Sequence, residues 1–190
     1  MIEKVANFNF KTNLLLKEFN KVKSLYLGEK VKRIRITYSD FDTENSPPYL
    51  VCSHNCKEAK AALDIGDRNS WSTENILKPF QNSYTEMVLK EVNTWFKAAG
   101  ERITVAKYAE IVSGQAFCLH TDNHYKFRYH IPISTNEGCM FYIDKQLYFM
   151  HDVGDMYKMT TNVEHATWNA GHTNRVHLIF DTTKIVKNSL

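Results

Sequence analysis

The hydrophobic pattern changes near residue 102, and this change constrains the fold more than any other feature of the sequence. Beyond it, apolar and polar residues alternate with a period of about two, as side chains on the two faces of a β-strand do. Turn residues such as Ser113-Gly114 and Asp144-Lys145 interrupt the alternation. Short strands separated by frequent turns indicate a sandwich or barrel, and a jelly roll of two sheets is one such fold. We predict strands over residues 102–112, 115–120, 126–133, 138–144, 146–150, 155–160, 163–168 and 174–181.

The first hundred residues carry helical as well as strand signals. Ser83 and Glu86 have the spacing of a capping box, in which a hydroxyl and a carboxylate satisfy free N–H groups of a first helical turn. Gly100 is suited to end the helix that follows. The sequence therefore predicts a mainly β fold with flanking helices, a double-stranded β-helix of the jelly-roll, cupin-like type. The predicted elements before the roll are helices over residues 11–26, 57–64 and 83–99 and a strand over 33–38.

Composition excludes several classes of protein. The 190 residues are 43% hydrophobic, which suits one independently folding domain. The net charge of +3 is spread along the chain, whereas nucleic-acid binding calls for a clustered basic face. The sequence has no apolar stretch of membrane-spanning length and no signal-peptide pattern at its start. We therefore expect a cytoplasmic protein that binds neither nucleic acid nor membrane.

Two of the four cysteines invite a zinc interpretation. Cys52 and Cys56 flank His54, but no second Cys/His pair lies nearby in the sequence. A structural zinc site needs four ligands, so we interpret these cysteines as loop residues. In a reducing compartment the thiols are expected to be free.

Two histidines and one aspartate form the strongest chemical signal. His120 and Asp122 are two residues apart, a spacing that places side chains on one face of a strand. His165 lies on a later predicted strand. Two imidazoles and one carboxylate form the facial triad of non-haem Fe(II) oxygenases, which leaves coordination positions open. This constellation predicts a metal site that joins two strands inside the roll.

An arginine follows His165 by ten residues and lies in an apolar strand. Arg175 is flanked by Val, Leu, Ile and Phe, so its guanidinium is expected to be partly buried. A buried guanidinium is costly without an anion, and its planar fork suits a carboxylate. One reading is a dicarboxylate co-substrate, and the other is a structural pair with an internal Asp or Glu. His177 should share the face of Arg175.

A second strand offers further positive groups. Arg128 and His130 share a face within the run Arg128-Tyr-His-Ile-Pro-Ile133. They could bind carboxylates of a co-substrate or substrate, or they could be structural or surface residues.

Three segments together resemble the catalytic half of the Fe(II)/2-oxoglutarate-dependent oxygenases. They are residues 105–122, the run Arg128–Ile133 and the region from His165 to Asp181, so that the resemblance covers residues 102–182. Within the superfamily the chain is most similar to the aspartyl/asparaginyl β-hydroxylase-like branch. In that branch an Arg-x-His-apolar-Pro-apolar strand follows the first metal histidine.

The resemblance implies a dioxygenase that uses Fe(II), 2-oxoglutarate and O2 to hydroxylate an unactivated C–H, with release of succinate and CO2. It implies a catalytic roll over residues 101–184, supported by residues 1–100 within a single domain of residues 1–190. The residues that it assigns are His120, Asp122 and His165 to the metal, Arg175 to the C5 carboxylate of 2-oxoglutarate, and Arg128, His130 and His177 to the co-substrate pocket.

The expected substrate is an amino acid or a peptide or protein side chain. His124 and Tyr125 are candidate substrate contacts because they follow the first two metal ligands closely. The hydroxylase that names the branch lacks the carboxylate ligand, whereas this chain has Asp122. This departure leaves the substrate open, and the sequence does not predict an oligomeric state.

Two other functions use the same fold. A metal cupin that does not use 2-oxoglutarate, such as an isomerase or dioxygenase, would usually have more histidine ligands and no buried strand arginine. An inert β-roll that serves as a binding module would not need an intact triad with Arg175.

Overall fold

The computed structural model describes residues 1–26, 33–37, 43–45, 74–122 and 126–185. The predicted helix over 57–64, the zinc candidates Cys52, His54 and Cys56, and the candidate substrate contacts His124 and Tyr125 lie outside the described residues. The chain forms two compact units. One comprises Met1–Lys21 with Tyr108–Ile179, and the other comprises Val22–Lys107 with Phe180–Leu190.

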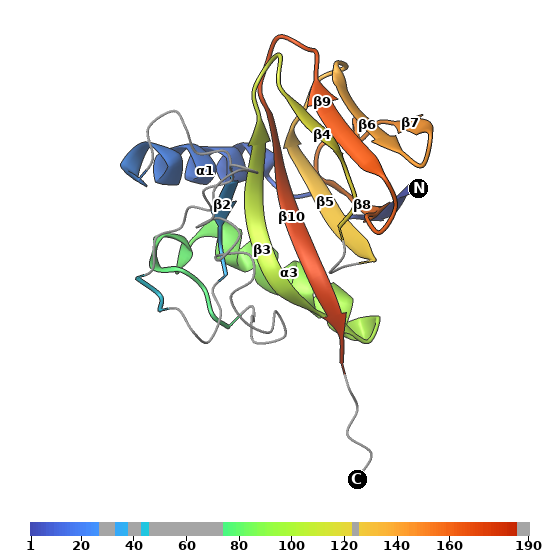
Figure 1. Cartoon of the computed structure of the whole chain (residues 1–190). Helices are drawn as coiled ribbons and strands as arrows, with labels where there is room; N and C mark the ends of the chain where they lie inside the picture. The colour runs from blue at the N-terminus through green and yellow to red at the C-terminus, as the bar shows by residue number, and fades with distance from the viewer. Residues whose placement is uncertain (27–32, 38–42, 46–73, 123–125, 186–190) are drawn as a thin grey trace. The chain divides into compact units, whose positions relative to one another are not determined.

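The first unit is built almost entirely from antiparallel strands (Figure 1). One of its sheets has the order β1-β8-β5-β10-β3, and the other has the order β4-β9-β6-β7. Strands β3 and β10 are long and also contribute to the second unit. The strands are β1 (Ile2–Asn7), β3 (Glu101–Ile111), β4 (Ala116–His120), β5 (Phe127–Ser134), β6 (Cys139–Ile143), β7 (Gln146–Tyr148), β8 (Asp155–Thr160), β9 (His165–Asn169) and β10 (Arg175–Lys184).

Alternate residues of the facing sheets meet in an apolar core. From β6, Phe141 and Ile143 are buried, and from β8, Tyr157 and Met159 are buried against them. The burial of β6 alternates strictly along the strand, as expected when one face packs inward. Burial of large apolar side chains contributes roughly 1.5–3 kcal/mol each. This core therefore holds the two sheets together and fixes which side chains face the interior.

The second unit carries the helical elements of residues 74–107. Helix α3 (Tyr84–Ala98) begins at Ser83, whose hydroxyl accepts a hydrogen bond from the backbone N–H of Glu86, as predicted. The Glu86 carboxylate accepts from the N–H of Asn82, one residue before the cap. Gly100 has a positive φ of 77°, a backbone conformation that suits glycine at a helix end. The unit also contains β2 (Arg33–Arg35) and a short 3-10 helix, η3 (Lys78–Phe80), while α1 (Thr12–Tyr26) begins in the first unit and ends in the second.

One apolar face of α3 forms the core of the second unit. Val88, Leu89, Val92 and Phe96 are fully buried at helical spacing. Phe96 contacts Phe180 of β10 edge-on, with ring centroids 6.5 Å apart. This face of the helix is therefore part of the core.

The mainly β fold with flanking helices is confirmed. Each of the eight strands predicted beyond residue 102 is present, with ends that differ by a few residues. Strand β1 was not predicted. It pairs with β8, from Ile2 opposite Met159 to Asn7 opposite Asp155, so its strand conformation depends on a partner about 150 residues away in sequence.

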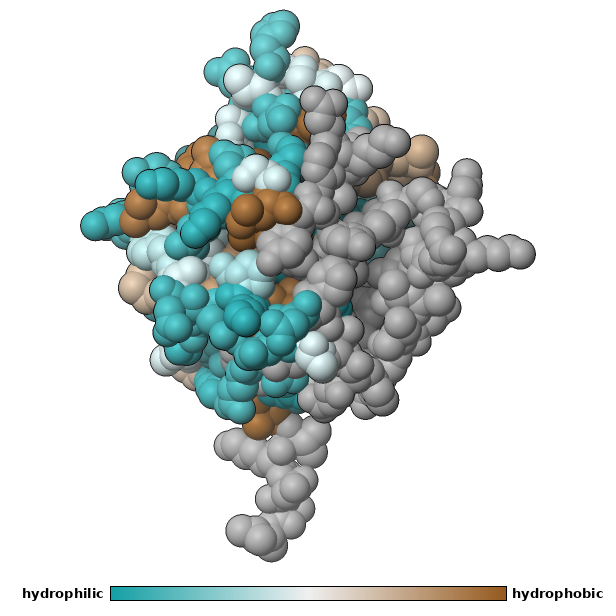
Figure 2. Space-filling model, turned by 90° about the vertical axis from the view of Figure 1, so that its left-hand side faces the viewer, coloured by the Kyte–Doolittle hydropathy of each residue, from teal (hydrophilic) through white to brown (hydrophobic). Residues whose placement is uncertain are grey.

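The molecular face shown in Figure 2 is mostly hydrophilic where the structure describes it, and its hydrophobic side chains form small separate patches. No helix among the described residues is long and apolar enough to span a membrane.

Candidate metal centre

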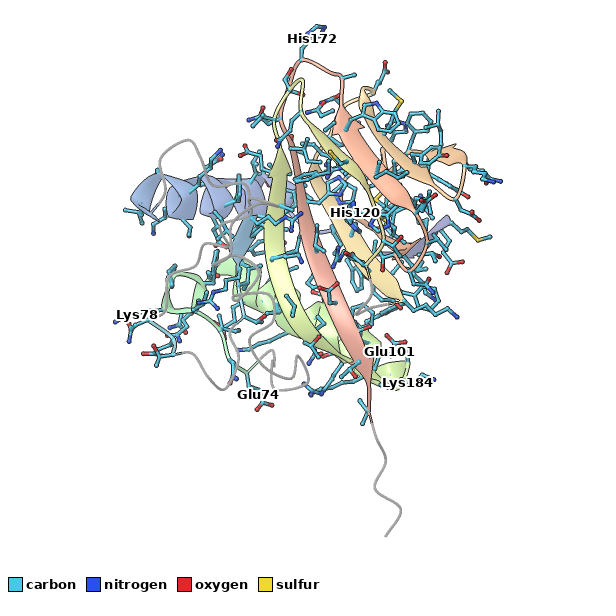
Figure 3. All side chains as sticks on the ribbon, in the orientation of Figure 1. Glu74, Lys78, Glu101, His120, His172 and Lys184 are labelled. Atoms are coloured by element: carbon cyan, nitrogen blue, oxygen red, sulfur yellow. The ribbon has the colours of Figure 1, made fainter. Side chains whose placement is uncertain are left out.

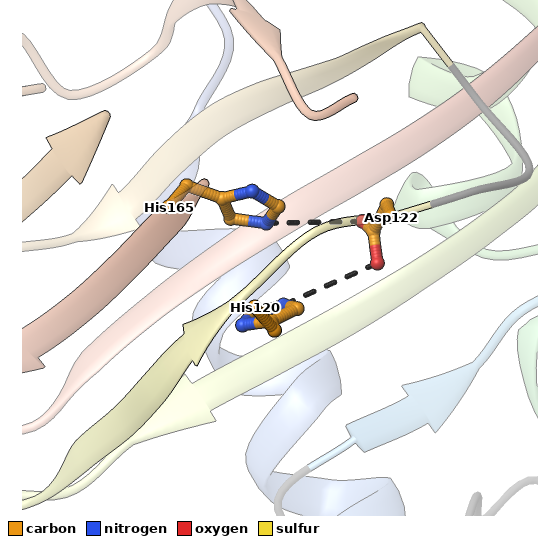
Figure 4. Close-up of side chains that lie close together, drawn as sticks. All are labelled: His120, Asp122 and His165. Carbon is orange, nitrogen blue, oxygen red and sulfur yellow. Dashed lines mark ion pairs between the residues drawn. The ribbon is translucent and has the colours of Figure 1, made fainter. Parts of the chain in front are cut away.

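Three side chains predicted as metal ligands meet in the first unit. The ligand atoms offered by His120, Asp122 and His165 all lie within 4.8 Å of one another (Figure 4). The Nε2 atoms of the two histidines each lie 4.0 Å from an oxygen of the Asp122 carboxylate. Donors about 2.1 Å from one ion lie at most about 4.2 Å apart, so the two separations of 4.0 Å fit a shared metal.

The strand pairing of the four-stranded sheet brings the histidines together. His120 ends β4 and lies directly opposite His165, the first residue of β9, and their ring centroids are 4.2 Å apart. Asp122 lies beyond the end of β4, so the two-residue strand spacing alone does not place it. Its backbone N–H donates to the carbonyl of Thr161, at 2.9 Å, and this contact fixes its position.

Both imidazoles are oriented by the backbone of their own strand segment. Nδ1 of His120 lies 2.8 Å from the carbonyl oxygen of Cys118, and Nδ1 of His165 lies 2.8 Å from that of Val163. A carbonyl only accepts, so each Nδ1 carries the proton and each Nε2 keeps its lone pair. Burial lowers the pKa of His165 below its ordinary value, which favours the neutral, ligating form. The Nε2 atoms are therefore prepared to bind a cation.

The Asp122 carboxylate also contacts an arginine. Nη1 of Arg128, in β5, lies 2.6 Å from Oδ2 of Asp122. Both side chains are largely shielded, with relative exposures of 17% and 23%. The structure thus joins one predicted metal ligand to one residue predicted to bind the co-substrate, a pairing that the sequence analysis missed.

Arg175 is buried, as predicted, at 2% relative exposure. Its Nη1 donates to the hydroxyl of Thr167 at 2.8 Å, and its guanidinium lies 4.8 Å above the ring of Phe141. Among the described residues no carboxylate pairs with it, and its Nε has no hydrogen-bond partner. Burial lowers its pKa to about 10, so that it remains cationic at neutral pH. The alternative of a structural pair with an internal Asp or Glu finds no support in the described residues.

The position of Arg175 is related to the metal centre through β9. Thr167 follows His165 by two residues, so both side chains project from one face, about 6.8 Å apart along the strand. The Thr167 hydroxyl also donates to the carbonyl of Met140 at 2.9 Å, which fixes its acceptor side toward Arg175. The hydrogen bond to Thr167 therefore places the guanidinium of Arg175 at the face of β9 that carries His165.

His130 and His177 form a buried pair. Their Nδ1 atoms lie 3.3 Å apart, so one ring donates and the other accepts. Both rings contact Phe141, with centroid distances of 5.8 and 6.0 Å. Burial, then Arg175 and then His130, hold the pKa of His177 well below its ordinary value, so it is neutral. The structure therefore places His130, His177 and Arg175 around one aromatic ring.

Two other histidines lie away from the centre. His172 lies in the loop between β9 and β10, at a distance from His120 (Figure 3). His151 is exposed and stacks on Phe149, with ring centroids 5.0 Å apart. Neither is brought to the metal centre.

The donor set suits a first-row divalent cation with open coordination positions. Two neutral nitrogens and one carboxylate oxygen converge, and the buried Arg175 offers a cationic site for an anion nearby. These residues fit Fe(II) together with a chelating dicarboxylate.

Comparisons with known proteins give a family and a fold. A protein-family model described as aspartyl/asparaginyl beta-hydroxylase matches residues 74–184, more than half of the chain. No curated protein sequence matches significantly. Among solved structures, the viral collagen prolyl hydroxylase vCPH from Paramecium Bursaria Chlorella virus-1, in complex with 2OG, is similar at a TM-score of 0.53 and 9% identity over 95% of this chain and 94% of that one. IDO from Bacillus thuringiensis is similar at a TM-score of 0.51 and 12% identity, over 96% and 90% of the two chains. These structural likenesses show a shared jelly-roll fold.

Proposed function

This chain belongs to the aspartyl/asparaginyl β-hydroxylase family, and from that membership we propose that it is an Fe(II)- and 2-oxoglutarate-dependent dioxygenase. It would hydroxylate an unactivated C–H, with release of succinate and CO2. One observation supports the proposal above all others. A convergent His120–Asp122–His165 cluster lies in the same unit as a buried arginine that has no carboxylate partner among the described residues.

Each residue has a separate task in this proposal. His120 and His165 hold the metal through Nε2, with their rings fixed by the Nδ1 contacts to backbone carbonyls. Asp122 supplies the third ligand and the negative charge. Bound Fe(II), with 2-oxoglutarate and O2, supplies the oxidising chemistry. The protein's own contribution is to hold ligands and co-substrate in place and to exclude water.

The co-substrate would be held at its far end by Arg175. Its guanidinium can bind the C5 carboxylate of 2-oxoglutarate, which would satisfy the free Nε and neutralise the buried charge. The histidine pair His130 and His177 would line the same pocket, with Phe141 as its apolar wall. This arrangement would leave the open coordination positions of the metal to the other end of 2-oxoglutarate and to O2.

The primary substrate is proposed at the level of class. Family membership favours an amino acid or a peptide or protein side chain, and the substrate contacts proposed at His124 and Tyr125 remain predictions. The cytoplasmic location also remains a prediction. We favour the oxygenase over an inert binding module because the module would not need convergent ligands beside a buried arginine.

An anaerobic titration tests the proposal. Fe(II) and 2-oxoglutarate added together should produce a visible charge-transfer band that neither produces alone. The Arg175→Met variant should need far more 2-oxoglutarate to give the same band, while its affinity for Fe(II) is unchanged. Arg175→Lys keeps the charge but loses the planar fork of the guanidinium, and it controls for a folding defect. The 2-oxoglutarate concentration that it needs should lie between those of the wild-type protein and Arg175→Met. Iron binding without the band would favour a metal cupin that does not use 2-oxoglutarate, and no iron binding would favour the binding module.

A further inference from the structure

The Asp122 carboxylate has two possible partners of positive charge, a metal and Arg128. The Arg128 guanidinium approaches Oδ2 at 2.6 Å, and Oδ2 also lies 4.0 Å from Nε2 of His165. Oδ1 lies 4.0 Å from Nε2 of His120. The contact with Arg128 is a close ion pair between two largely shielded side chains. Oδ2 carries the ion pair with the arginine, so Oδ1 is the oxygen that this ion pair leaves to the cluster.

Backbone contacts independently hold this pair in register. The N–H of Asp122 donates to the carbonyl of Thr161 at 2.9 Å, and the N–H of Thr161 donates to the carbonyl of Lys126 at 3.0 Å. Lys126 lies two residues before Arg128, which itself pairs with Met159 across β5 and β8. Thr161 therefore links the backbone of Asp122 to the start of β5 by hydrogen bonds. These backbone contacts hold the side chains of Asp122 and Arg128 close enough to form their ion pair.

The charges near the cluster show what the arginine can contribute. Asp122 is the one anionic member of the three-residue cluster, since the other two are histidines. A carboxylate free of other partners can bind a metal through both oxygens, which would use up a coordination position. A guanidinium on Oδ2 leaves Oδ1 as the single donor, so an open position is kept. The positive charge of Arg128 repels a bound metal only weakly, because the Asp122 carboxylate offsets that charge at Oδ2.

We propose that Arg128 is a positioning residue for the Asp122 carboxylate, which it aims at the metal through one oxygen, and that it is not a contact for 2-oxoglutarate. The inference rests on the proposed metal site and deepens it. It also replaces the role that the sequence analysis gave to Arg128. Arg175 is then the arginine left for the co-substrate.

The proposal predicts that removal of Arg128 has opposite effects on metal affinity in the presence and in the absence of Asp122. With Asp122 present, Arg128 orients a ligand, and loss of such a partner typically costs 10- to 100-fold in metal affinity. With Asp122 removed, the positive charge of Arg128 lies beside the site without the Asp122 carboxylate to offset it, and it repels the metal. Its removal should then raise the affinity.

Calorimetric titration of the metal-free protein with Co(II) tests the sign change. The variants are Arg128→Met, Asp122→Ala and the double variant. Lys126→Met is the matched control because it removes one positive charge from an exposed side chain two residues away. Arg128→Met should weaken Co(II) binding about 10-fold in the wild-type background and strengthen it in the Asp122→Ala background. Lys126→Met should change neither by more than about 2-fold.

Each other outcome has a definite meaning. Stronger Co(II) binding for Arg128→Met in both backgrounds would mean that Arg128 acts only as a nearby charge, which overturns the inference. If Arg128→Met leaves the Co(II) affinity unchanged but weakens 2-oxoglutarate binding, Arg128 is a contact for the co-substrate, and this result also overturns the inference. If the wild-type chain itself binds no Co(II), the proposed function fails as well. Arg128→Lys, which keeps the charge with a single donor group, should bind Co(II) with intermediate affinity and guards against a folding defect of Arg128→Met.

Discussion

Two buried side-chain nitrogens of β10, Nε of Arg175 and Nε2 of His177, lack a hydrogen-bond partner among the described residues. An unsatisfied buried polar group costs about 1–3 kcal/mol, so a folded protein rarely keeps one without a reason. Both atoms belong to β10 residues that lie on one face of the strand and contact the ring of Phe141. A bound carboxylate, such as that of the proposed 2-oxoglutarate, would satisfy Nε of Arg175.

His177 should make the stability of the protein depend on pH. Its pKa in the folded chain is well below the ordinary value of 6.5, because burial, Arg175 and His130 all oppose protonation. Below pH 6.5 the unfolded chain therefore binds a proton that the folded chain does not, so the free energy of unfolding should fall as the pH falls. The slope from one such proton is up to about 1.4 kcal/mol per pH unit.

The variant His177→Leu should remove that part of the slope. Denaturant unfolding at several values between about pH 5 and pH 7 would measure it. His172→Leu is the control, since it replaces an exposed histidine by the same residue. His165, whose pKa is also lowered by burial, should leave some slope of the same sign in both variants. Equal slopes for His177→Leu and the wild-type chain would show that His177 does not titrate differently on folding.

Among single elements, α3 depends most visibly on its first turn. Ser83 satisfies the N–H of Glu86, and the Glu86 carboxylate both accepts from Asn82 and pairs with Lys90, one turn later, at 2.6 Å. Ser83→Ala should lower the free energy of unfolding by about 1 kcal/mol, measured by denaturant titration. Thr94→Ala, an exposed mid-helix change, should alter it by less than about 0.5 kcal/mol. An equal loss in both would mean that the cap does not stabilise the helix specifically.

The sequence predicts elements well where a local pattern decides them. The strands from β3 to β10 carry period-two alternation between turn residues, and α3 carries both a cap and an apolar face. Strand β1 was missed because its strand conformation depends on pairing with the distant β8. Tertiary context of this kind is not visible in a local window.

The same distinction applies to the site. Spacing indicated the residue types of the metal cluster and the burial of Arg175. It could not indicate that Arg128 meets Asp122, because that contact depends on a backbone bridge through Thr161. Nor could it indicate the contact between Nδ1 of His130 and Nδ1 of His177, which lie on different strands. Residue types follow from the sequence, whereas pairings need the fold.

At the scale of the whole molecule, the unit that holds the candidate metal centre combines distant parts of the chain, Met1–Lys21 and Tyr108–Ile179. Non-local pairing of this kind must overcome a large loop-closure entropy, so the N-terminal segment should join the roll late in folding. Two sets of contacts then hold the N-terminal segment against the roll. Ile2 packs against the core between the sheets, and Lys4 lies 2.9 and 2.7 Å from carboxylate oxygens of Asp152 and Asp155.

Removal of residues 1–7 should therefore damage the roll by exposing the edge of β8. Strand β1 covers that edge, and an uncovered edge presents unpaired N–H and C=O groups that template association with another chain. The truncated protein should melt at a lower temperature and show a higher mass by light scattering than the full chain. Lys4→Met keeps the strand and removes only the two ion pairs, so it should change the melting temperature less and leave the mass unchanged. A truncated protein with the mass and melting temperature of the full chain would show that β1 is dispensable, and that strands β4 to β10 form a stable roll without the N-terminal segment.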